Sequence, residues 1–213
     1  NFYVLKATNL DLSGMKKVIA DFEKILAQNR TGNDIALFYF SGHGAGINAE
    51  GKNYLFPINN GNIEDEYQVS DRAIHTDTIL TAMKTANRSG VNLMMLDACR
   101  DKPYNGRPKS RGRGMLPTPP VSGTVQAYAT AFGKTASDNG DGRNSLYTTH
   151  LLQILEVAKQ EPIGIEDILI EVGELVSNES NGNQKPSYNY AVSDRICLGF
   201  KDCKQPIQVN TTN

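Results

Sequence analysis

Two continuous apolar runs constrain the fold of this chain more than any other feature. They read DIALFYFS over residues 34–41 and VNLMML over residues 91–96. A strand exposed on one face alternates apolar and polar residues, whereas a strand buried on both faces is apolar throughout. Helical spacing of apolar residues predicts helices at 13–27, 76–86, 145–157 and 165–176. This order predicts an α/β fold, an αβα domain whose mostly parallel sheet has helices on both faces.

Three more segments have the composition of strands: residues 2–7, 124–130 and 188–198. We find no internal repeat or composition break, so residues 1–213 are predicted to form a single domain. Hydrophobic residues make up 39% of the chain and the formal net charge is −1, which are ordinary values for a globular protein. No apolar run reaches the ~18 residues of a membrane span. No excess charge favours nucleic acid either, so we expect neither a membrane nor a nucleic acid as partner.

The composition changes in residues 100–120. This segment contains five prolines, and six Lys or Arg against one acidic residue. Together with its glycines, this composition predicts a flexible, basic surface loop. Residues 107–113, which contain four of these basic residues, have no interleaved aromatic residue, so they lack the usual pattern of a nucleic-acid-binding segment.

A histidine and a cysteine follow the two apolar runs. The first run leads into SGHG, where His43 lies between two glycines, and the second leads into DACR, which contains Cys99. Reactive groups in α/β proteins collect beyond the carboxyl ends of the strands. A Cys–His pair supplies a thiolate nucleophile and a proton donor for a leaving amine. The N–H groups of Gly44 and Cys99 are candidates for stabilising an oxyanion.

Each of these two residues also has a structural interpretation. A lone cysteine at a strand end is usually a small buried apolar side chain, and a lone histidine is usually structural. Here the two stand at matching strand ends, 56 positions apart (99 − 43). The combination is much more specific for catalysis than either residue alone.

The segments FYFSGHG and LMMLDACRDKPY, which contain His43 and Cys99, carry a family resemblance. They resemble the His and Cys boxes of the caspase-like cysteine peptidases of family C14, particularly the bacterial metacaspase and paracaspase branches. The segment GTVQAYATAFGKTASDNGDGRNSLYTTHLL is similar to the part that builds the substrate cleft in that family. The resemblance covers residues 2–198.

The resemblance implies a caspase-like three-layer αβα sandwich with His43 and Cys99 as the catalytic dyad. It also implies that Gly44 lies in the oxyanion hole. Family members usually begin with a further strand and helix, which have no counterpart before residue 2. We therefore expect that this part was cleaved, is disordered or is supplied elsewhere.

Acidic residues at the expected pocket predict which side chain is cut. Asp97 matches the acidic pocket residue of metacaspases and paracaspases, and Asp138 stands where true caspases place an arginine. Two carboxylates favour Lys or Arg at P1, the substrate residue before the cut bond. Ala136 and Ser137 would line the edge where a peptide pairs its backbone. The alternative is that Asp97 caps a turn and Asp138 is an ordinary loop residue.

A peptidase of this specificity could cut its own basic loop. The candidate positions are Arg107, Lys109, Arg111 and Arg113, and the last two are favoured because glycine follows each. The alternative to self-cleavage is that the loop is solvated and its basic residues only balance acidic charge elsewhere in the protein. The alternative to an active cysteine peptidase is that the chain is a zymogen-like or inactive scaffold that binds a protein partner.

The remaining expectations concern the cysteines, cofactors and location. Three cysteines are an odd, low number, which argues against a disulfide scaffold and favours a reducing compartment, although Cys197 and Cys203 are close enough in sequence to pair. The N-terminus lacks the order of a signal peptide, so a cytoplasmic location is expected. No cofactor is required and no zinc-site spacing occurs. Calcium dependence, known in some metacaspases, stays open, although DNGDGRN lacks the spacing of an EF-hand loop. Whether the chain forms a homodimer also stays open.

Overall fold

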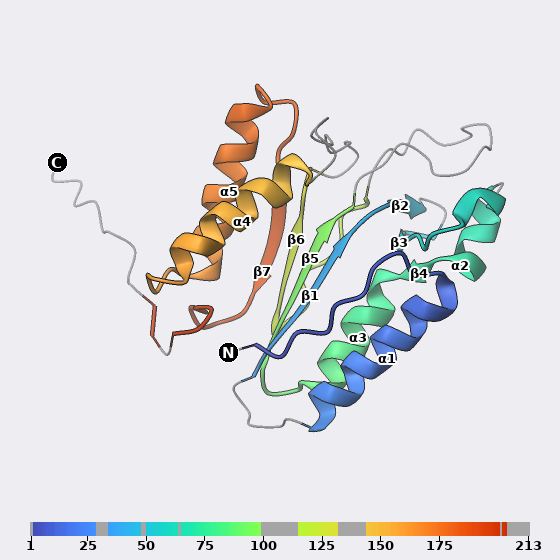
Figure 1. The fold of residues 1–213 in the computed structure, drawn as a ribbon, viewed down its shortest axis with the longest axis horizontal. Helices are drawn as coiled ribbons and strands as arrows, with labels where there is room; N and C mark the ends of the chain where they lie inside the picture. The colour runs from blue at the N-terminus through green and yellow to red at the C-terminus, as the bar shows by residue number, and fades with distance from the viewer. Residues whose placement is uncertain are drawn as a thin grey trace, which may run out of the picture.

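A four-stranded sheet forms the centre of the molecule (Figure 1). The computed structural model describes residues 2–28, 34–47, 50–63, 65–98, 115–131, 144–200 and 202–203. The strands run in the order β1 (Ile35–Ser41), β5 (Val91–Asp97), β6 (Thr124–Tyr128) and β7 (Ser187–Ala191). The first three are parallel, and β7 is antiparallel to β6. The two apolar runs are therefore neighbouring strands, as predicted.

Helices cover both faces of this sheet (Figure 1). One face carries α1 (Leu12–Gln28) and α3 (Thr76–Ala86), and the other carries α4 (Leu146–Ala158) and α5 (Ile165–Glu179). This arrangement confirms the predicted αβα sandwich with a mostly parallel sheet. None of the helices in the described part of the chain is both long and apolar enough to cross a membrane.

The alternation of side chains along the strands divides the core into two parts. In β5, Leu93 and Met95 pack in the cluster that contains α4 and α5, whereas Met94 and Leu96 pack in the cluster that contains α1 and α3. All four side chains are at most 2% exposed. Successive strand residues point to opposite faces, so burial on both sides requires an unbroken apolar run. The same alternation directs Asp97 toward the α4 side.

A smaller sheet follows β1 and was not predicted from the sequence. It contains β2 (Gly44–Ile47), β3 (Lys52–Leu55) and β4 (Ile74–His75), which are antiparallel. Between β3 and β4 lie two 3₁₀ turns and a short helix: η1 (Asn60–Asn62), η2 (Glu66–Gln68) and α2 (Val69–Arg72). These strands have only two to four residues, which is too short for a periodic pattern to be recognised.

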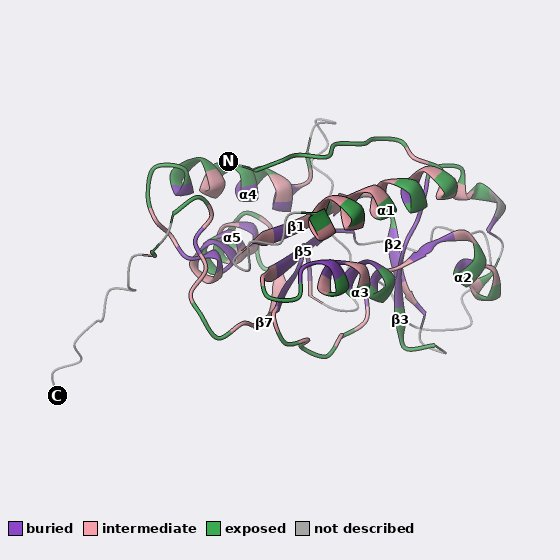
Figure 2. Ribbon diagram, turned by 90° about the horizontal axis from the view of Figure 1, so that it is seen from below, coloured by how far each residue is buried: buried purple, intermediate pink, exposed green. Residues whose placement is uncertain are grey.

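Three predicted strands need correction. Residues 2–7 form no strand, and the apolar side chains at their start are exposed: Phe2, Tyr3, Val4 and Leu5. Figure 2 shows this segment running along the outside of the molecule. Strand propensity alone is insufficient here because no neighbouring strand pairs with the segment in the described structure. The strands expected at 124–130 and 188–198 end earlier, at Tyr128 and Ala191.

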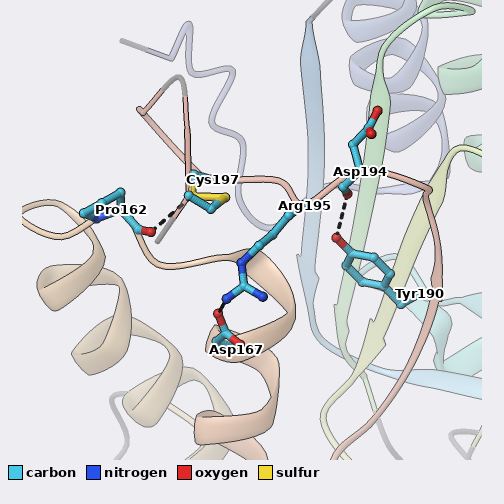
Figure 3. Close-up of a disulfide and its surroundings, with 7 residues drawn as sticks. Pro162, Asp167, Tyr190, Asp194, Arg195 and Cys197 are labelled. Atoms are coloured by element: carbon cyan, nitrogen blue, oxygen red, sulfur yellow. Dashed lines mark hydrogen bonds and ion pairs between the residues drawn. A yellow bond between two sulfur atoms is a disulfide. The ribbon is translucent and has the colours of Figure 1, made fainter. Parts of the chain in front are cut away.

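The cysteine count was a poor guide, because Cys197 and Cys203 form a disulfide. The bridge follows a stretch that is fixed to the start of α5 (Figure 3). Ile165 donates its N–H to the carbonyl of Ile196 at 2.7 Å, and Arg195 forms an ion pair with Asp167 in the first turn of α5. The disulfide weakens the argument for a reducing compartment, which rested on the number of cysteines.

Candidate active site

The register of β1 and β5 brings the two motif-bearing strand ends together. Ile35 pairs with Val91 and Ser41 pairs with Asp97, so paired residues differ by 56 positions. His43 and Cys99 are separated by the same number. Contact continues beyond the last pair, because the N–H of Gly42 donates to the carbonyl of Asp97 at 3.2 Å. The parallel ladder therefore extends to the residue before His43.

The backbone at His43 turns from the central sheet into the small sheet. The N–H of Phe56 donates to the carbonyl of His43 at 2.8 Å. Gly44 and Leu55 are the next pair in the antiparallel register. Hydrogen-bonded and non-hydrogen-bonded pairs alternate in such a ladder, so Gly44 belongs to a non-hydrogen-bonded pair. Its N–H consequently points away from β3.

Gly44 lies directly beside the residue that precedes Cys99. A Cβ placed on Gly44 would lie 3.0 Å from the Cβ of Ala98 and 3.2 Å from the carbonyl oxygen of Tyr54. The Sδ of Met115 would be 3.3 Å away. Both Gly44 and Ala98 are buried. Glycine is favoured here by the close approach of the surrounding atoms rather than by an unusual backbone angle.

Asp97 is a buried carboxylate surrounded by hydroxyl groups. It is 6% exposed, and its Oδ2 accepts hydrogen bonds from Ser145 at 2.5 Å and from Thr148. The hydroxyls of Tyr39 and Ser41 lie farther away, at 3.4 and 3.5 Å. No cation forms an ion pair with Asp97 among the residues that the structure describes. Buried carboxylates usually have a cationic partner, so this arrangement is unusual.

The protons in this cluster can be assigned from the contacts. Ser145 caps α4 by accepting the N–H of Thr148 at 3.0 Å, which leaves its own hydroxyl proton for Asp97. Thr148 also donates to Asp97, so the close contact of 2.5 Å between Thr148 Oγ1 and Tyr39 Oη requires Tyr39 to donate. Burial raises the pKa of Tyr39, and the charge of Asp97 adds to this effect. The phenol therefore remains a donor at neutral pH.

A second phenol near Asp97 is fully buried. Burial raises the pKa of Tyr147, and the charge of Asp97 acts in the same direction. The hydroxyl of Tyr147 has no hydrogen-bond partner in the described structure. This side chain keeps its proton throughout the neutral range.

Residues 115–118, which the structure describes together with 119–120 of the predicted loop 100–120, are held by contacts with the domain, whereas residues 100–114 lie outside the described residues and the prediction for them stays untested. Met115 is 2% exposed, and the side chain of Asn53 pairs with both backbone groups of Leu116, at 2.9 and 2.6 Å. Asn189 donates to the carbonyl of Thr118 at 2.9 Å. The composition did not reveal this anchoring because it depends on a buried side chain from β3.

The structure describes three of the predicted site residues, His43, Gly44 and Asp97, and brings them to one edge of the sheet. The others lie outside the described residues: Cys99, Arg107, Lys109, Arg111, Arg113, Ala136, Ser137 and Asp138. Sequence reasoning missed the hydroxyl groups around Asp97. The strand pattern places Tyr39 and Ser41 on the face of Asp97, but nothing in the sequence indicates that Ser145 and Thr148 also reach it.

A metal site or a binding pocket elsewhere on the described surface could compete with the ends of β1 and β5. No group of three His, Cys, Asp or Glu side chains there lies close enough to hold a metal ion. A hollow of about 480 Å³ lies between α5 and β7, and no predicted site residue lines it. The strand ends of β1 and β5 therefore remain the candidate active site.

Comparison with known proteins identifies a matching family. The family model of the caspase domain of the C14 peptidases matches residues 1–196. A comparison with individual curated proteins finds none that matches the chain.

Proposed function

The chain belongs to the caspase-domain family of cysteine peptidases, and from this membership we propose that it cleaves proteins after Arg or Lys, with Cys99 as nucleophile and His43 as base. The family makes it a cysteine-type peptidase acting on protein substrates. The particular dyad and the preference for a basic P1 residue are our proposals. The specificity rests on one observation: the carboxylate of Asp97 is buried, and no cation among the described residues pairs with it.

Support for the dyad comes from the register. The offset of 56 between β1 and β5 equals the separation of His43 and Cys99, and the ladder is still in contact at Gly42 and Asp97. A continuation of this register would bring the imidazole and the thiol to the same edge of the sheet. The histidine would take the thiol proton and return it to the leaving amine.

Support for the oxyanion site comes from Gly44. Its N–H is not used in the β2–β3 ladder, and the residue lies against Ala98, directly before Cys99. A preorganised backbone donor beside the nucleophile stabilises the negative charge that develops on the carbonyl oxygen. We propose that the N–H groups of Gly44 and Cys99 act together in this role.

Support for a basic P1 residue comes from charge. Asp97 is buried at the edge where the substrate would bind, and within the described residues only hydroxyl groups compensate its charge. A P1 Lys or Arg would supply the missing cation. A P1 aspartate would instead meet a like charge in a desolvated pocket, which is unfavourable by several kcal/mol. Asp138 is proposed as the second acidic residue, with Ala136 and Ser137 along the peptide-binding edge.

The anchoring of residues 115–118 supports self-processing within the preceding segment. If the chain is cut after Arg107, Lys109, Arg111 or Arg113, Met115 and Leu116 keep their buried contacts with the rest of the domain. The domain would then stay together after the cut.

The test uses fluorogenic peptides that differ only in P1: Arg, Lys or Asp, each with and without calcium. We expect cleavage after Arg and Lys, loss of all cleavage in Cys99→Ala, and a decrease of kcat/KM by about 10- to 100-fold in Asp97→Asn, which removes a charge-assisted contact. Asp21→Asn, the same change on the exposed side of α1, serves as the matched control. Asp138→Ala tests the second acid.

Each alternative outcome has a clear meaning. Cleavage after Asp would retain the dyad and refute the pocket. Absence of cleavage from the folded protein, with calcium present, would favour a zymogen or a partner-binding scaffold. Gel analysis of the same samples tests self-processing, because fragments should form in the wild type and be absent in Cys99→Ala.

A further inference from the structure

The two oxygens of Asp97 are in different environments. All four hydroxyl contacts of the carboxylate go to Oδ2, from Tyr39, Ser41, Ser145 and Thr148. Within the described structure, no hydrogen bond reaches Oδ1. Both close donors, Ser145 and Thr148, come from the first turn of α4 and its cap. The helix start therefore determines how the carboxylate is held.

The unequal environments of the two oxygens affect how a guanidinium and an ammonium group can bind to Asp97. A guanidinium binds a carboxylate best through two parallel hydrogen bonds, one to each oxygen. An ammonium group is a compact charge that needs only one oxygen. When Oδ2 is already occupied by two close donors, a two-point contact with Arg would have to displace them.

Building on the proposed preference for basic P1 residues, we propose that Ser145 and Thr148 are positioning residues that set the balance between Lys and Arg. They occupy Oδ2 of Asp97 and leave Oδ1 for a one-point contact with the P1 cation. This geometry removes the advantage that Arg would otherwise gain from a two-point contact. Removal of a hydroxyl donor from Oδ2 shifts the preference of the enzyme toward Arg.

The experiment measures kcat/KM for two peptides that differ only in Lys or Arg at P1. In Thr148→Val, which keeps the shape of the side chain and removes its hydroxyl, the Arg:Lys ratio should rise by about three- to tenfold, the effect of one additional charge-assisted hydrogen bond. Thr148→Ser should restore the wild-type ratio. Thr149→Val is the matched control, because the hydroxyl of Thr149 contacts the carbonyl of Ser145 and not Asp97.

A general loss of stability would change both substrates alike, so the ratio separates positioning from a structural effect. An unchanged ratio in Thr148→Val, or an equal change in Thr149→Val, would overturn the inference. If Thr148→Val does not fold, Ser145→Gly removes the other close donor to Oδ2 at a helix-cap position where glycine is well tolerated. Its ratio should move in the same direction, and an unchanged ratio would again refute the role.

The outcome also distinguishes this inference from the proposed function. If the wild type cleaves after neither Lys nor Arg, the proposed specificity is wrong and the inference falls with it. If the wild type cleaves after both and the ratio is insensitive to these variants, only the role of Ser145 and Thr148 is wrong.

Discussion

Gly44 has little room for a side chain, and its neighbour Ala98 directly precedes Cys99, the proposed nucleophile. The added methyl group of Gly44→Ala would press on Ala98, on the backbone of Tyr54 and on Met115. Ala98 is 0% exposed and precedes Cys99 in the chain. At the scale of single residues, packing therefore constrains the backbone directly before the proposed nucleophile.

We predict that Gly44→Ala lowers kcat by about tenfold or more, because the oxyanion donor and the start of the Cys99 segment are displaced. The free energy of unfolding should decrease by about 1–3 kcal/mol through overpacking. Steady-state kinetics and urea unfolding check both values. The control is Gly173→Ala in α5, where an added Cβ meets no atom within 4 Å. That variant should keep its activity and gain about 0.5–1 kcal/mol of stability. Wild-type kcat in Gly44→Ala would refute the oxyanion role.

At the scale of helices and strands, His75 lies at the junction of β4 and α3. His75 ends β4 and occupies the N-cap position of α3 without a side-chain cap bond, and its ring lies 5.3 Å from the ring of Tyr54. Its Nε2 is buried without a hydrogen-bond partner and lies 3.5 Å from Oδ2 of Asp77. Burial lowers the pKa of His75, Lys52 acts in the same direction, and Asp77 and Glu50 oppose the shift. The joint between these elements is therefore sensitive to acid.

The sign of the pH effect follows from this lowered pKa. Well above about pH 6.5, the ordinary pKa of histidine, the side chain is neutral in both states and contributes no pH dependence. Below that value the unfolded chain binds the proton more readily, so the free energy of unfolding should decrease as the pH falls toward the lower pKa of the folded state. Urea unfolding at several values between pH 7.5 and pH 5 tests this, with His75→Gln expected to show a shallower dependence. Parallel curves for the two proteins would contradict the prediction.

At the scale of the whole molecule, the disulfide fixes the end of the described domain. Cys197 and Cys203 are six positions apart, and the segment before them is bound to the start of α5 through Ile165 and Asp167. Closing a short loop of this size contributes about 2 kcal/mol in the chain-entropy account of disulfides. The bridge leaves Cys99 as the one cysteine without a disulfide partner in the sequence.

We predict that alkylation of the denatured, non-reduced protein modifies one thiol, and that alkylation after reduction modifies three. Mass spectrometry of peptides should assign the first thiol to Cys99. Reduction should also lower the free energy of unfolding by about 2 kcal/mol, whereas Cys203→Ser should be insensitive to reductant. Three modified thiols without reduction would show that the bridge does not form in solution.

The long, periodic features of the sequence determined the central architecture. The apolar runs at 34–41 and 91–96 became adjacent buried strands, and the four predicted helices formed close to their expected ranges. Periodicity succeeds in these segments because each buries a continuous face, so the pattern of side chains and the position of the core impose the same spacing. The ends of the two strands lie at the same edge of the sheet, as expected for neighbouring parallel strands, whereas the pairing of His43 with Cys99 stays a prediction.

Tertiary structure alone decided the details that depend on distant partners. The pairing of β4 with β3 and the anchoring of Leu116 by Asn53 arise from contacts far apart in the chain. Residues 2–7 form no strand because no strand in the described structure pairs with them. The hydroxyl groups around Asp97 are the clearest case, since Thr148 lies 51 positions away and reaches the carboxylate only when α4 packs on the sheet. A sequence pattern records which faces are buried, whereas the partner of a buried polar group is fixed by how the packed elements meet.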